Sequence, residues 1–328
     1  MLKSFRTSLL AASAVTLQIC ATQSSALELK LANVLPESHN WNVAARGFAD
    51  EVKAQTENRV SIKLFANGQL GSENTLVEGL QIGSIHAGII GCGSFQPVDP
   101  KFGIVELPYS WPNRQAAYAA YDGELGEQLE GLAEAHNFKI LSWWENGYRH
   151  ITNNRAPIHT PEDLQGLKIR VTPDKMRLDA FAGMGASPAP LAFGELYSAL
   201  QQGVFDAQEN PLSIINSSSF YEVQKYVSLT GHVWSPACLT VSNYSWNRLS
   251  AEDQQIVQDL ADKWRDTQRE LTQKDDAELI AKLEAAGMQV NEVDTAPFSA
   301  QVQDIWTQYE SVFGADLVGL VKRYSSAQ

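Results

Sequence analysis

Short strands and helices alternate along much of this sequence, and this alternation limits the folds that the chain can adopt. Segments 27–33, 59–66 and 86–95 are predicted strands, and segments 39–56 and 72–85 between them are predicted helices, with apolar residues at helical spacing in the first. A strand–helix–strand–helix–strand order is typical of a parallel sheet with helices on both faces. We therefore expect an α/β fold.

A second alternating set begins near residue 138. Strands are predicted at 138–153, 167–171, 187–192 and 204–211, and helices at 175–184 and 194–203. A helix start is also expected at Thr160, which is followed by Pro161 and by Asp163 in capping-box position. No low-complexity linker separates the two sets, so the two domains expected of about 300 mature residues should be joined by strands that act as a hinge.

The segment from Ser250 to Met288 has a different pattern. Ser250 is a predicted N-cap, and apolar residues keep helical spacing as far as Gly287. Such a helix would be about 50 Å long, longer than either domain is expected to be wide. A coiled-coil seam is an alternative, but the heptad is not sustained. We expect a strut that packs across both domains.

The first 26 residues have the pattern of a secretory signal peptide. Lys3 and Arg6 precede an apolar stretch from Leu9 to Cys20 and then small residues, and we expect cleavage after Ala26. Ile19 before Cys20 argues against a lipoprotein signal. No later segment is long and apolar enough to cross a bilayer. The mature protein is therefore expected to be exported and soluble.

The charge of the chain excludes some partners and leaves others open. Its formal net charge is −13, and loss of the signal peptide would remove two cations and no anions, giving −15. An acidic balance argues against nucleic-acid binding, which needs clustered cations. It does not exclude an anionic small molecule, because a local pocket can be cationic.

Motifs for catalysis, metals and cofactors are missing from the sequence. It contains no HExxH, no cysteine pair at metal spacing, no GxGxxG, no phosphate loop and no GxSxG, and its six histidines are scattered. We expect no metal and no cofactor, and a catalytic pair assembled only in space stays an alternative. Cys92 and Cys238 remain after cleavage; they could pair in an oxidising compartment, but buried free thiols are the favoured interpretation.

One cation stands out in the strand at 167–171. The apolar residues of this strand alternate and point to one face, so Lys168 and Arg170 point to the other. The strand ends at Thr172-Pro173. A guanidinium at the end of a strand in an α/β fold lies where such folds bind ligands.

Several stretches of the sequence resemble one family. The runs "GLKIRV", "GASPAPLAFGELYSALQQGVFDAQENPLSII", "FYEVQKYVSLTGH" and "NGQLGSENTLVEGLQIGSIHAG" are similar to the periplasmic solute-binding subunit of TRAP (tripartite ATP-independent periplasmic) transporters. The resemblance extends over nearly the whole mature chain. It implies two doubly wound α/β domains joined by crossing strands around a ligand cleft, with a long helix spanning both. The expected domains are residues 27–146 with 236–275, and residues 147–235 with 276–328.

The resemblance also implies ligand-binding residues. Arg170 matches an arginine that holds a ligand carboxylate, and its planar fork can donate two parallel hydrogen bonds to such a group. The alternative is a pair with a structural Asp or Glu. Arg149 matches a second arginine that contacts the ligand, and the alternative for it is a surface ion pair. Asn210 matches an asparagine that forms a hydrogen bond with the same carboxylate or with a neighbouring hydroxyl. Phe193 matches an aromatic residue that forms a wall of the ligand site. Further candidates are Asn33, Glu37, Trp234 and Tyr148.

The expected function is binding rather than catalysis. The protein would capture a small organic acid in the periplasm by closing its domains, and deliver it to the membrane subunits of a TRAP transporter. Sugar acids such as uronates or aldonates are favoured, and C4-dicarboxylates, 2-oxo acids, sulfonates and ectoine-like ligands stay open. An exported enzyme using the same cleft and a sensor that presents ligand to a membrane receptor are the alternative functions. We expect a monomer.

Overall fold

The computed structural model describes residues 26–326, and within them the strands form one nine-stranded mixed sheet. The strand order is β2-β1-β3-β8-β4-β7-β5-β6, and β9 pairs with β8. The strands are β1 (Leu27–Ala32), β2 (Val60–Phe65), β3 (Ala87–Gly91), β4 (Phe138–Asn153), β5 (Lys168–Val171), β6 (Ser187–Pro190), β7 (Ala207–Pro211), β8 (Tyr226–Ser242) and β9 (Gln289–Glu292).

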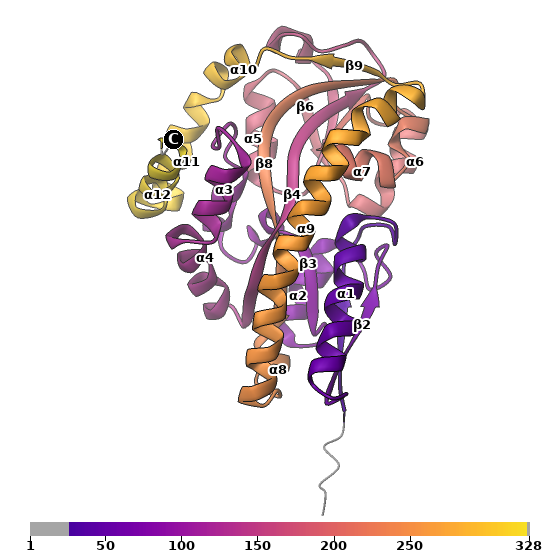
Figure 1. Cartoon of the computed structure of the whole chain (residues 1–328). Helices are drawn as coiled ribbons and strands as arrows, with labels where there is room; N and C mark the ends of the chain where they lie inside the picture. The colour runs from indigo at the N-terminus through magenta and orange to yellow at the C-terminus, as the bar shows by residue number, and fades with distance from the viewer. Residues whose placement is uncertain (1–25, 327–328) are drawn as a thin grey trace, which may run out of the picture.

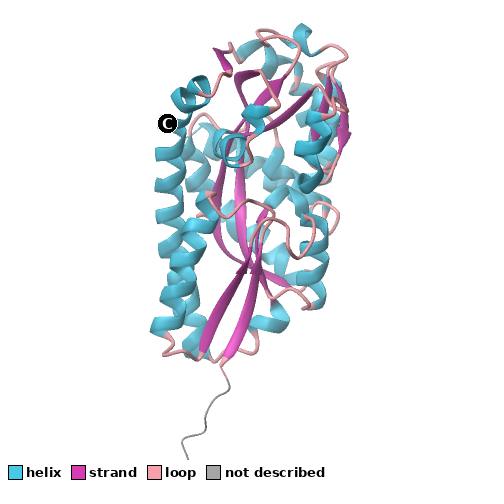
Figure 2. Ribbon diagram, turned by 90° about the vertical axis from the view of Figure 1, so that its right-hand side faces the viewer, coloured by secondary structure: helices cyan, strands magenta, loops and turns pink. Residues whose placement is uncertain are grey.

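Two long antiparallel strands, β4 and β8, form the middle of this sheet and run along the molecule (Figure 2). The parallel strands β1, β2 and β3 lie on the β8 side, and the parallel strands β5, β6 and β7 lie on the β4 side. We call the part of the molecule around β1–β3 the first lobe and the part around β5–β7 the second lobe. The α/β class and the crossing strands predicted from the sequence are confirmed.

The pairing of β4 with β8 is interrupted where the strands pass between the lobes. Register shifts occur between Ile140 and Ser142, between Glu145 and Gly147, and between Arg149 and Ile151. Gly147 has φ of 119°, a conformation that only glycine adopts without strain. Shifts of this kind bend and twist a strand. They therefore allow the same two strands to serve both lobes.

Helices cover the sheet, and one of them extends along both lobes (Figure 1). The 35-residue α9 begins at Ser250, whose side chain accepts a hydrogen bond from the backbone of Asp253. It packs on α1 of the first lobe, on α7 of the second lobe and on β4 between them. The predicted strut is confirmed. The helices are α1 (Asn40–Gln55), α2 (Glu73–Ile82), α3 (Arg114–Tyr121), α4 (Glu124–Ala135), α5 (Lys175–Gly183), α6 (Leu196–Gln201), α7 (Leu212–Ser217), α8 (Asn243–Trp246), α9 (Ala251–Ala285), α10 (Ala296–Gln301), α11 (Gln303–Phe313) and α12 (Ala315–Ser326).

Five short 3₁₀ helices, η1 (Cys92–Phe95), η2 (Pro100–Glu106), η3 (Pro161–Leu164), η4 (Phe193–Glu195) and η5 (Phe220–Glu222), complete the described elements. The helix start expected at Thr160 is present with its capping box, but it leads into the single turn of η3. The C-terminal α12 packs on α3 and α4, which lie in the first predicted domain, although its residues were assigned to the second. The domain limits stay a prediction.

A buried hydrogen-bond cluster joins α9 to β4. The side-chain amide of Gln268 donates to the backbone carbonyl of Glu145 at 2.8 Å and accepts from its backbone N–H at 2.7 Å. The Glu145 carboxylate is fully buried and accepts from Arg114, Tyr118 and the indole of Trp234. Because the charge is paired and hydrogen-bonded, its burial is compensated. The cluster fixes the strut to the crossing strand.

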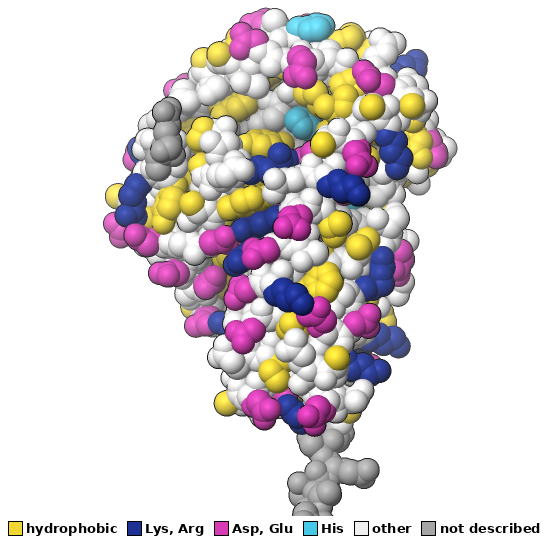
Figure 3. Space-filling view, viewed as in Figure 1, with side chains coloured by type: hydrophobic (Ala, Val, Ile, Leu, Met, Phe, Trp, Pro, Cys, Tyr) yellow, Lys and Arg dark blue, Asp and Glu magenta, His cyan; other side chains and the backbone are white. Residues whose placement is uncertain are grey.

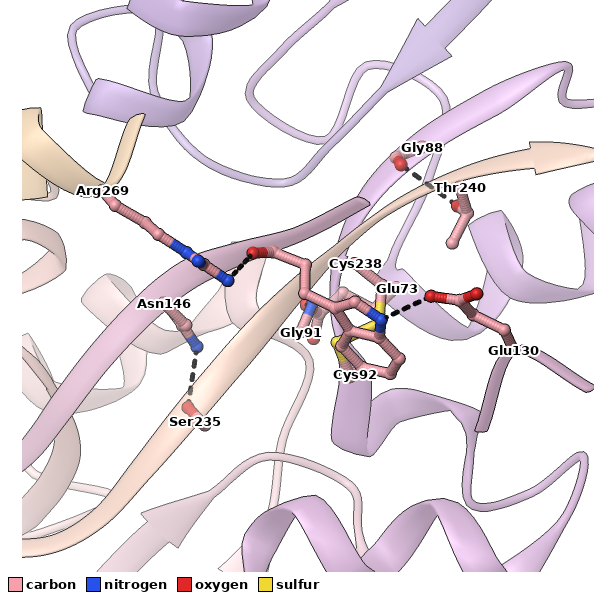
Figure 4. Close-up of a disulfide and its surroundings, with 11 residues drawn as sticks. Glu73, Gly88, Gly91, Cys92, Glu130, Asn146, Ser235, Cys238, Thr240 and Arg269 are labelled. Atoms are coloured by element: carbon pink, nitrogen blue, oxygen red, sulfur yellow. Dashed lines mark hydrogen bonds between the residues drawn. A yellow bond between two sulfur atoms is a disulfide. The ribbon is translucent and has the colours of Figure 1, made fainter. Parts of the chain in front are cut away.

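The favoured interpretation of the cysteines was wrong: Cys92 and Cys238 are not free thiols but form a disulfide (Figure 4). Their Cα atoms are 5.4 Å apart although 146 residues separate them in sequence. The reason is the sheet topology, which pairs Ile90 of β3 with Cys238 of β8 and so brings Cys92 close. Both cysteines are fully buried, as expected. Among residues 26–326, no helix is both long enough and apolar enough to span a membrane, and residues 1–25, with the predicted signal peptide, lie outside the described part.

Candidate ligand-binding site

A cavity lies between the two lobes, beside the place where β4 crosses. Its walls surround about 420 Å³ of space not filled by protein atoms, part of which opens to solvent. The lining residues are Val34, Leu35, Trp41, Glu73, Gly91, Gly93, Ser94, Glu106, Asn146, Arg149, Arg170, Thr172, Asp174, Arg177, Phe193, Asn210 and Ile214.

Arg170 lies at the end of β5 in the wall of this cavity, as the strand pattern predicted. Its side chain is buried, and Nε and Nη2 both donate to the backbone carbonyl of Leu191, at 2.9 and 2.6 Å. Within residues 26–326, no carboxylate forms an ion pair with Arg170, and no group accepts a hydrogen bond from its Nη1. The alternative role of Arg170, an ion pair with a structural Asp or Glu, is therefore not observed among residues 26–326.

Phe193 forms part of the same wall. Its ring centre lies 6.0 Å from the Arg170 guanidinium carbon, within range of a cation–π contact. Burial lowers the pKa of Arg170 to about 10, and the nearby cations Arg149 and Arg177 add to this effect, while Glu209 and Glu73 oppose it. Arg170 therefore remains charged at neutral pH, in surroundings that favour an added anion.

Arg149 comes from β4 and also faces the cavity, but it has a carboxylate partner. Its guanidinium donates to both carboxylate oxygens of Glu209 on β7 and, at 2.9 Å, to Oδ1 of Asn210. The pair is buried, so the surface ion pair considered as an alternative is excluded. The Asn210 amide in turn donates to Gln208, which leaves Asn210 fixed in the cavity wall.

A third buried arginine, Arg177 of α5, was missed by the sequence analysis. It donates to Glu106 from two nitrogens, at 3.1 and 2.6 Å, and its Nη1 lies 3.4 Å from Glu209. Although burial alone would lower it, the charges of Glu106, Glu209 and Asp174 raise the pKa of Arg177. Because η2 carries Glu106 and α5 carries Arg177, this ion pair joins two helices that are far apart in sequence.

Glu209 and Asp174 are buried acids in the same cluster with opposite pKa shifts. Burial opposes ionisation of Glu209, but Arg149, Arg177 and His232 outweigh it and hold its pKa well below the usual range. Burial raises the pKa of Asp174 to about 7. A useful sequence signal was the position of Asp174 and Arg177 in the first turn of the helix after the Arg170 strand, at the strand end where α/β folds bind ligands.

Four predicted site residues lie outside the lining of the cavity, which differs from the prediction. Asn33 is buried beside it and is bonded to Asn42 and to the backbone of Leu35. Glu37 is exposed and pairs with Arg46. The remaining two, Trp234 and Tyr148, lie near Glu145 and Arg114 respectively.

The placement of these four residues has a common physical reason. Each contacts another residue of the protein, and sequence order does not reveal such partners. Conversely, Glu73 and Asn146 line the cavity and were not predicted. No group of His, Cys, Asp and Glu side chains within the described residues is arranged to hold a metal ion.

Two α/β lobes joined by long strands, with a cavity between them that contains the buried cation Arg170, define a two-lobed solute-binding protein. A family model described as bacterial extracellular solute-binding protein, family 7, matches residues 31–312. The chain belongs to this family of solute-binding transport proteins, and its resemblance to the solute-binding subunits of TRAP transporters is confirmed.

Three similar proteins illustrate the relationship. The 2,3-diketo-L-gulonate-binding periplasmic protein YiaO of Escherichia coli K12 is 33% identical over 302 residues, which cover 90% of this chain and 92% of that protein. The sugar acid binding protein DctPAm from Advenella mimigardefordensis, in complex with galactonate, has a TM-score of 0.89 at 29% identity and covers 92% of this chain and 99% of its own. A TRAP periplasmic solute binding protein from Polaromonas sp. JS666, bound to D-erythronate, has a TM-score of 0.89 at 35% identity, with coverage of 92% and 100%.

Proposed function

We propose that this protein captures a sugar acid, such as an aldonate or a uronate, in the periplasm and delivers it to the membrane subunits of a TRAP transporter. The observation that carries the proposal is Arg170, a buried cation in the cavity wall without a carboxylate partner in residues 26–326. A buried unpaired charge is unfavourable. A ligand carboxylate would supply the missing charge.

The geometry of Arg170 suits a carboxylate better than a neutral group. Nε and Nη2 are occupied by Leu191, so Nη1 and the remaining proton of Nη2 are the donors that can turn to the ligand. Arg149 and Asn210 border the same space and would contact the other carboxylate oxygen or a neighbouring hydroxyl. Charge-assisted hydrogen bonds of this type are stronger than neutral ones, especially away from water.

The named ligands of the similar proteins support a hydroxylated carboxylate. The Escherichia coli relative is named for 2,3-diketo-L-gulonate, and the two structures contain galactonate and D-erythronate. The polar lining described above offers both donors and acceptors for such molecules.

Several parts of the proposal concern the whole molecule. We propose that the chain is exported with cleavage near Ala26, acts as a monomer, and closes its two lobes by bending β4 and β8 at their register shifts. The domain limits 27–146 with 236–275 and 147–235 with 276–328 belong to this hypothesis. Ligand capture by closure needs no chemical step, so we propose no enzymatic activity.

A thermal-shift screen tests the function. The mature protein is heated with sugar acids, with their amides and with the parent aldoses, and with C4-dicarboxylates, 2-oxo acids, sulfonates and ectoine. A ligand at about 100 times its Kd stabilises the fold by ~2.7 kcal/mol, which raises Tm by several degrees. We expect such a shift with at least one sugar acid and none with its amide or aldose. Equal shifts from acid and neutral sugar would overturn the carboxylate hypothesis.

A further inference from the structure

The first-lobe wall of the cavity carries a carboxylate that the proposed function has not used. Glu73 is the first residue of α2, and its side chain lines the cavity. Its Oε1 accepts from the backbone N–H of Gly91 at 3.4 Å, and its Oε2 accepts from the Ser94 hydroxyl at 3.2 Å. These two donors, which precede and follow Cys92 in the sequence, hold the carboxylate at the end of β3. Figure 4 labels Glu73, Gly91 and the disulfide of Cys92.

Asn146 adds a second acceptor from β4. Its Nδ2 donates to the hydroxyl of Ser235 at 3.2 Å, whereas its Oδ1 is buried and has no hydrogen-bond partner among residues 26–326 (Figure 4). A buried carbonyl oxygen without a donor is costly. A ligand hydroxyl is a donor that would satisfy it.

The charges of the lining are therefore unequal between the two lobes. In the second lobe, Arg170 is a cation without an ion-pair partner in the described chain, and it forms none with Glu73. Arg149 and Arg177 are already neutralised by Glu209 and Glu106. One carboxylate can be balanced at Arg170, but a second one at the Glu73 side would meet a like charge and acceptors that offer it no proton.

We propose that Glu73, with Asn146, binds the hydroxyl groups of the ligand and excludes a second carboxylate. The site would then select hydroxylated monocarboxylates, such as aldonates, over dicarboxylates of the same length. This inference rests on the proposed function, because it assumes that Arg170 holds the first carboxylate.

Matched acid pairs test this selectivity by calorimetry. Erythronate and meso-tartrate, gluconate and glucarate, and galactonate and galactarate differ within each pair only by a terminal carboxylate in place of a terminal CH₂OH. For the wild type, in the pair that binds, we expect the Kd of the dicarboxylate to be at least about 100-fold higher than the Kd of the monocarboxylate. This ratio corresponds to a difference in binding free energy of ~2.7 kcal/mol. Equal affinities within that pair would overturn the inference even if no variant can be made.

Glu73→Gln is the informative variant, because the amide keeps an acceptor for hydroxyls and removes the charge. We expect the ratio of the two Kd values to fall about tenfold or more, through tighter binding of the dicarboxylate. Glu195→Gln removes an equal charge from an exposed position outside the cavity lining and should leave the ratio unchanged.

The outcomes separate the inference from the function on which it rests. If a monocarboxylate binds and Glu73→Gln leaves the ratio as in the wild type, the selectivity assigned to Glu73 is wrong and the function stands. If Glu195→Gln lowers the ratio as much as Glu73→Gln, the effect is one of overall charge, and the assignment is also wrong. If no member of any pair binds, the inference fails, and the thermal-shift screen with the other acids, uronates included, decides on the function.

Discussion

Arg170 differs from the other buried arginines of the described chain in its lack of a carboxylate partner. Arg149 is paired with Glu209, Arg177 with Glu106, and Arg269 with Asp122. In these three pairs the charge of the arginine is compensated inside the protein, so it needs no ligand to balance it. Arg170 instead has only the carbonyl of Leu191 and the ring of Phe193. At the scale of one residue, this difference separates a structural arginine from a candidate ligand-binding one.

Replacement of Arg170 should abolish binding. We expect Arg170→Ala to lose detectable binding and Arg170→Lys to bind some hundredfold to thousandfold more weakly, because loss of one partner of a buried charge pair costs about 3–5 kcal/mol. Lysine cannot reproduce the planar fork. Isothermal titration with the best acid from the thermal screen measures the effect, and Lys168→Ala, an exposed change on the same strand, is the control. Wild-type affinity in the Arg170→Lys variant would disprove the hypothesis that the planar guanidinium of Arg170 holds the ligand carboxylate.

His39 should make the stability of the protein depend on pH. This residue caps α1 and contacts Ser213 of α7 at 3.3 Å, and burial lowers its pKa to about 3. In the unfolded chain the His39 imidazole binds a proton below about pH 6.5, whereas in the folded protein it stays neutral down to about pH 3. The free energy of unfolding therefore falls as the pH drops from 6.5 towards 3, by about 2 kcal/mol at pH 5. Thermal unfolding of ligand-free protein between pH 7.5 and pH 4.5 measures this loss.

The matched variants for this test are His39→Asn, which keeps a capping acceptor, and His159→Asn at an exposed site. We expect the first to reduce the dependence of Tm on pH and the second to leave it unchanged. If His39→Asn has the pH dependence of the wild type, the histidine is not the source of the effect.

The sequence predicted part of the site because some of its information is local. Arg170 stands at a strand end, and Arg149, Asn210 and Phe193 could be placed in the cleft from the resemblance; their contacts with a ligand remain predictions. The ion pair of Arg177 with Glu106 joins residues far apart in sequence, so no spacing rule indicates it. Glu73 has the position of an ordinary acid in the first turn of a helix, which concealed its place in the cavity wall.

At the scale of the elements, local signals were sufficient where an element is defined by its own residues. The N-cap at Ser250 and the apolar spacing after it predicted a helix from 250 to 288, and α9 spans Ala251–Ala285. The disulfide was not predictable in this way, because it depends on the pairing of β3 with β8. Non-local contacts of this kind follow from the topology of the sheet and are not visible in a local pattern.

The disulfide should stabilise the first lobe. We expect the Cys92→Ser, Cys238→Ser double variant to lose about 2–5 kcal/mol of unfolding free energy, since the bridge closes a long loop in the unfolded chain. For a protein of this size, that loss lowers Tm by roughly 3–8 °C. Thermal unfolding with and without reductant measures it: the reductant should lower Tm of the wild type and leave that of the variant unchanged. Equal Tm values for both proteins without reductant would contradict the stabilising role.

At the scale of the whole molecule, β4, β8 and α9 all run along both lobes. The strands carry the register shifts, whereas α9 is a continuous helix held to β4 by Gln268. We therefore expect the strands to bend during closure while the helix stays intact.

On the face seen in Figure 3, acidic and basic side chains are interspersed, and no large patch of one sign is visible there.

Small-angle X-ray scattering tests the closure. A saturating acid ligand should reduce the radius of gyration of the wild-type protein, because the lobes move together around the bound anion. The Arg170→Ala variant with the same ligand concentration should keep the ligand-free profile. An unchanged wild-type profile at saturation, established by titration in the same buffer, would indicate a rigid site rather than a hinged one.

The position of β8 in the sheet also determines the order in which a growing chain can be completed. β3 and β8 are neighbours in the first lobe, but all of β4 to β7 is synthesised between them. Until β8 emerges, one edge of β3 has no strand beside it, and Cys238, the disulfide partner of Cys92, has not been made. Pairing between such distant segments slows folding. A newly made chain would thus remain open for longer, and the export proposed above requires such an open state.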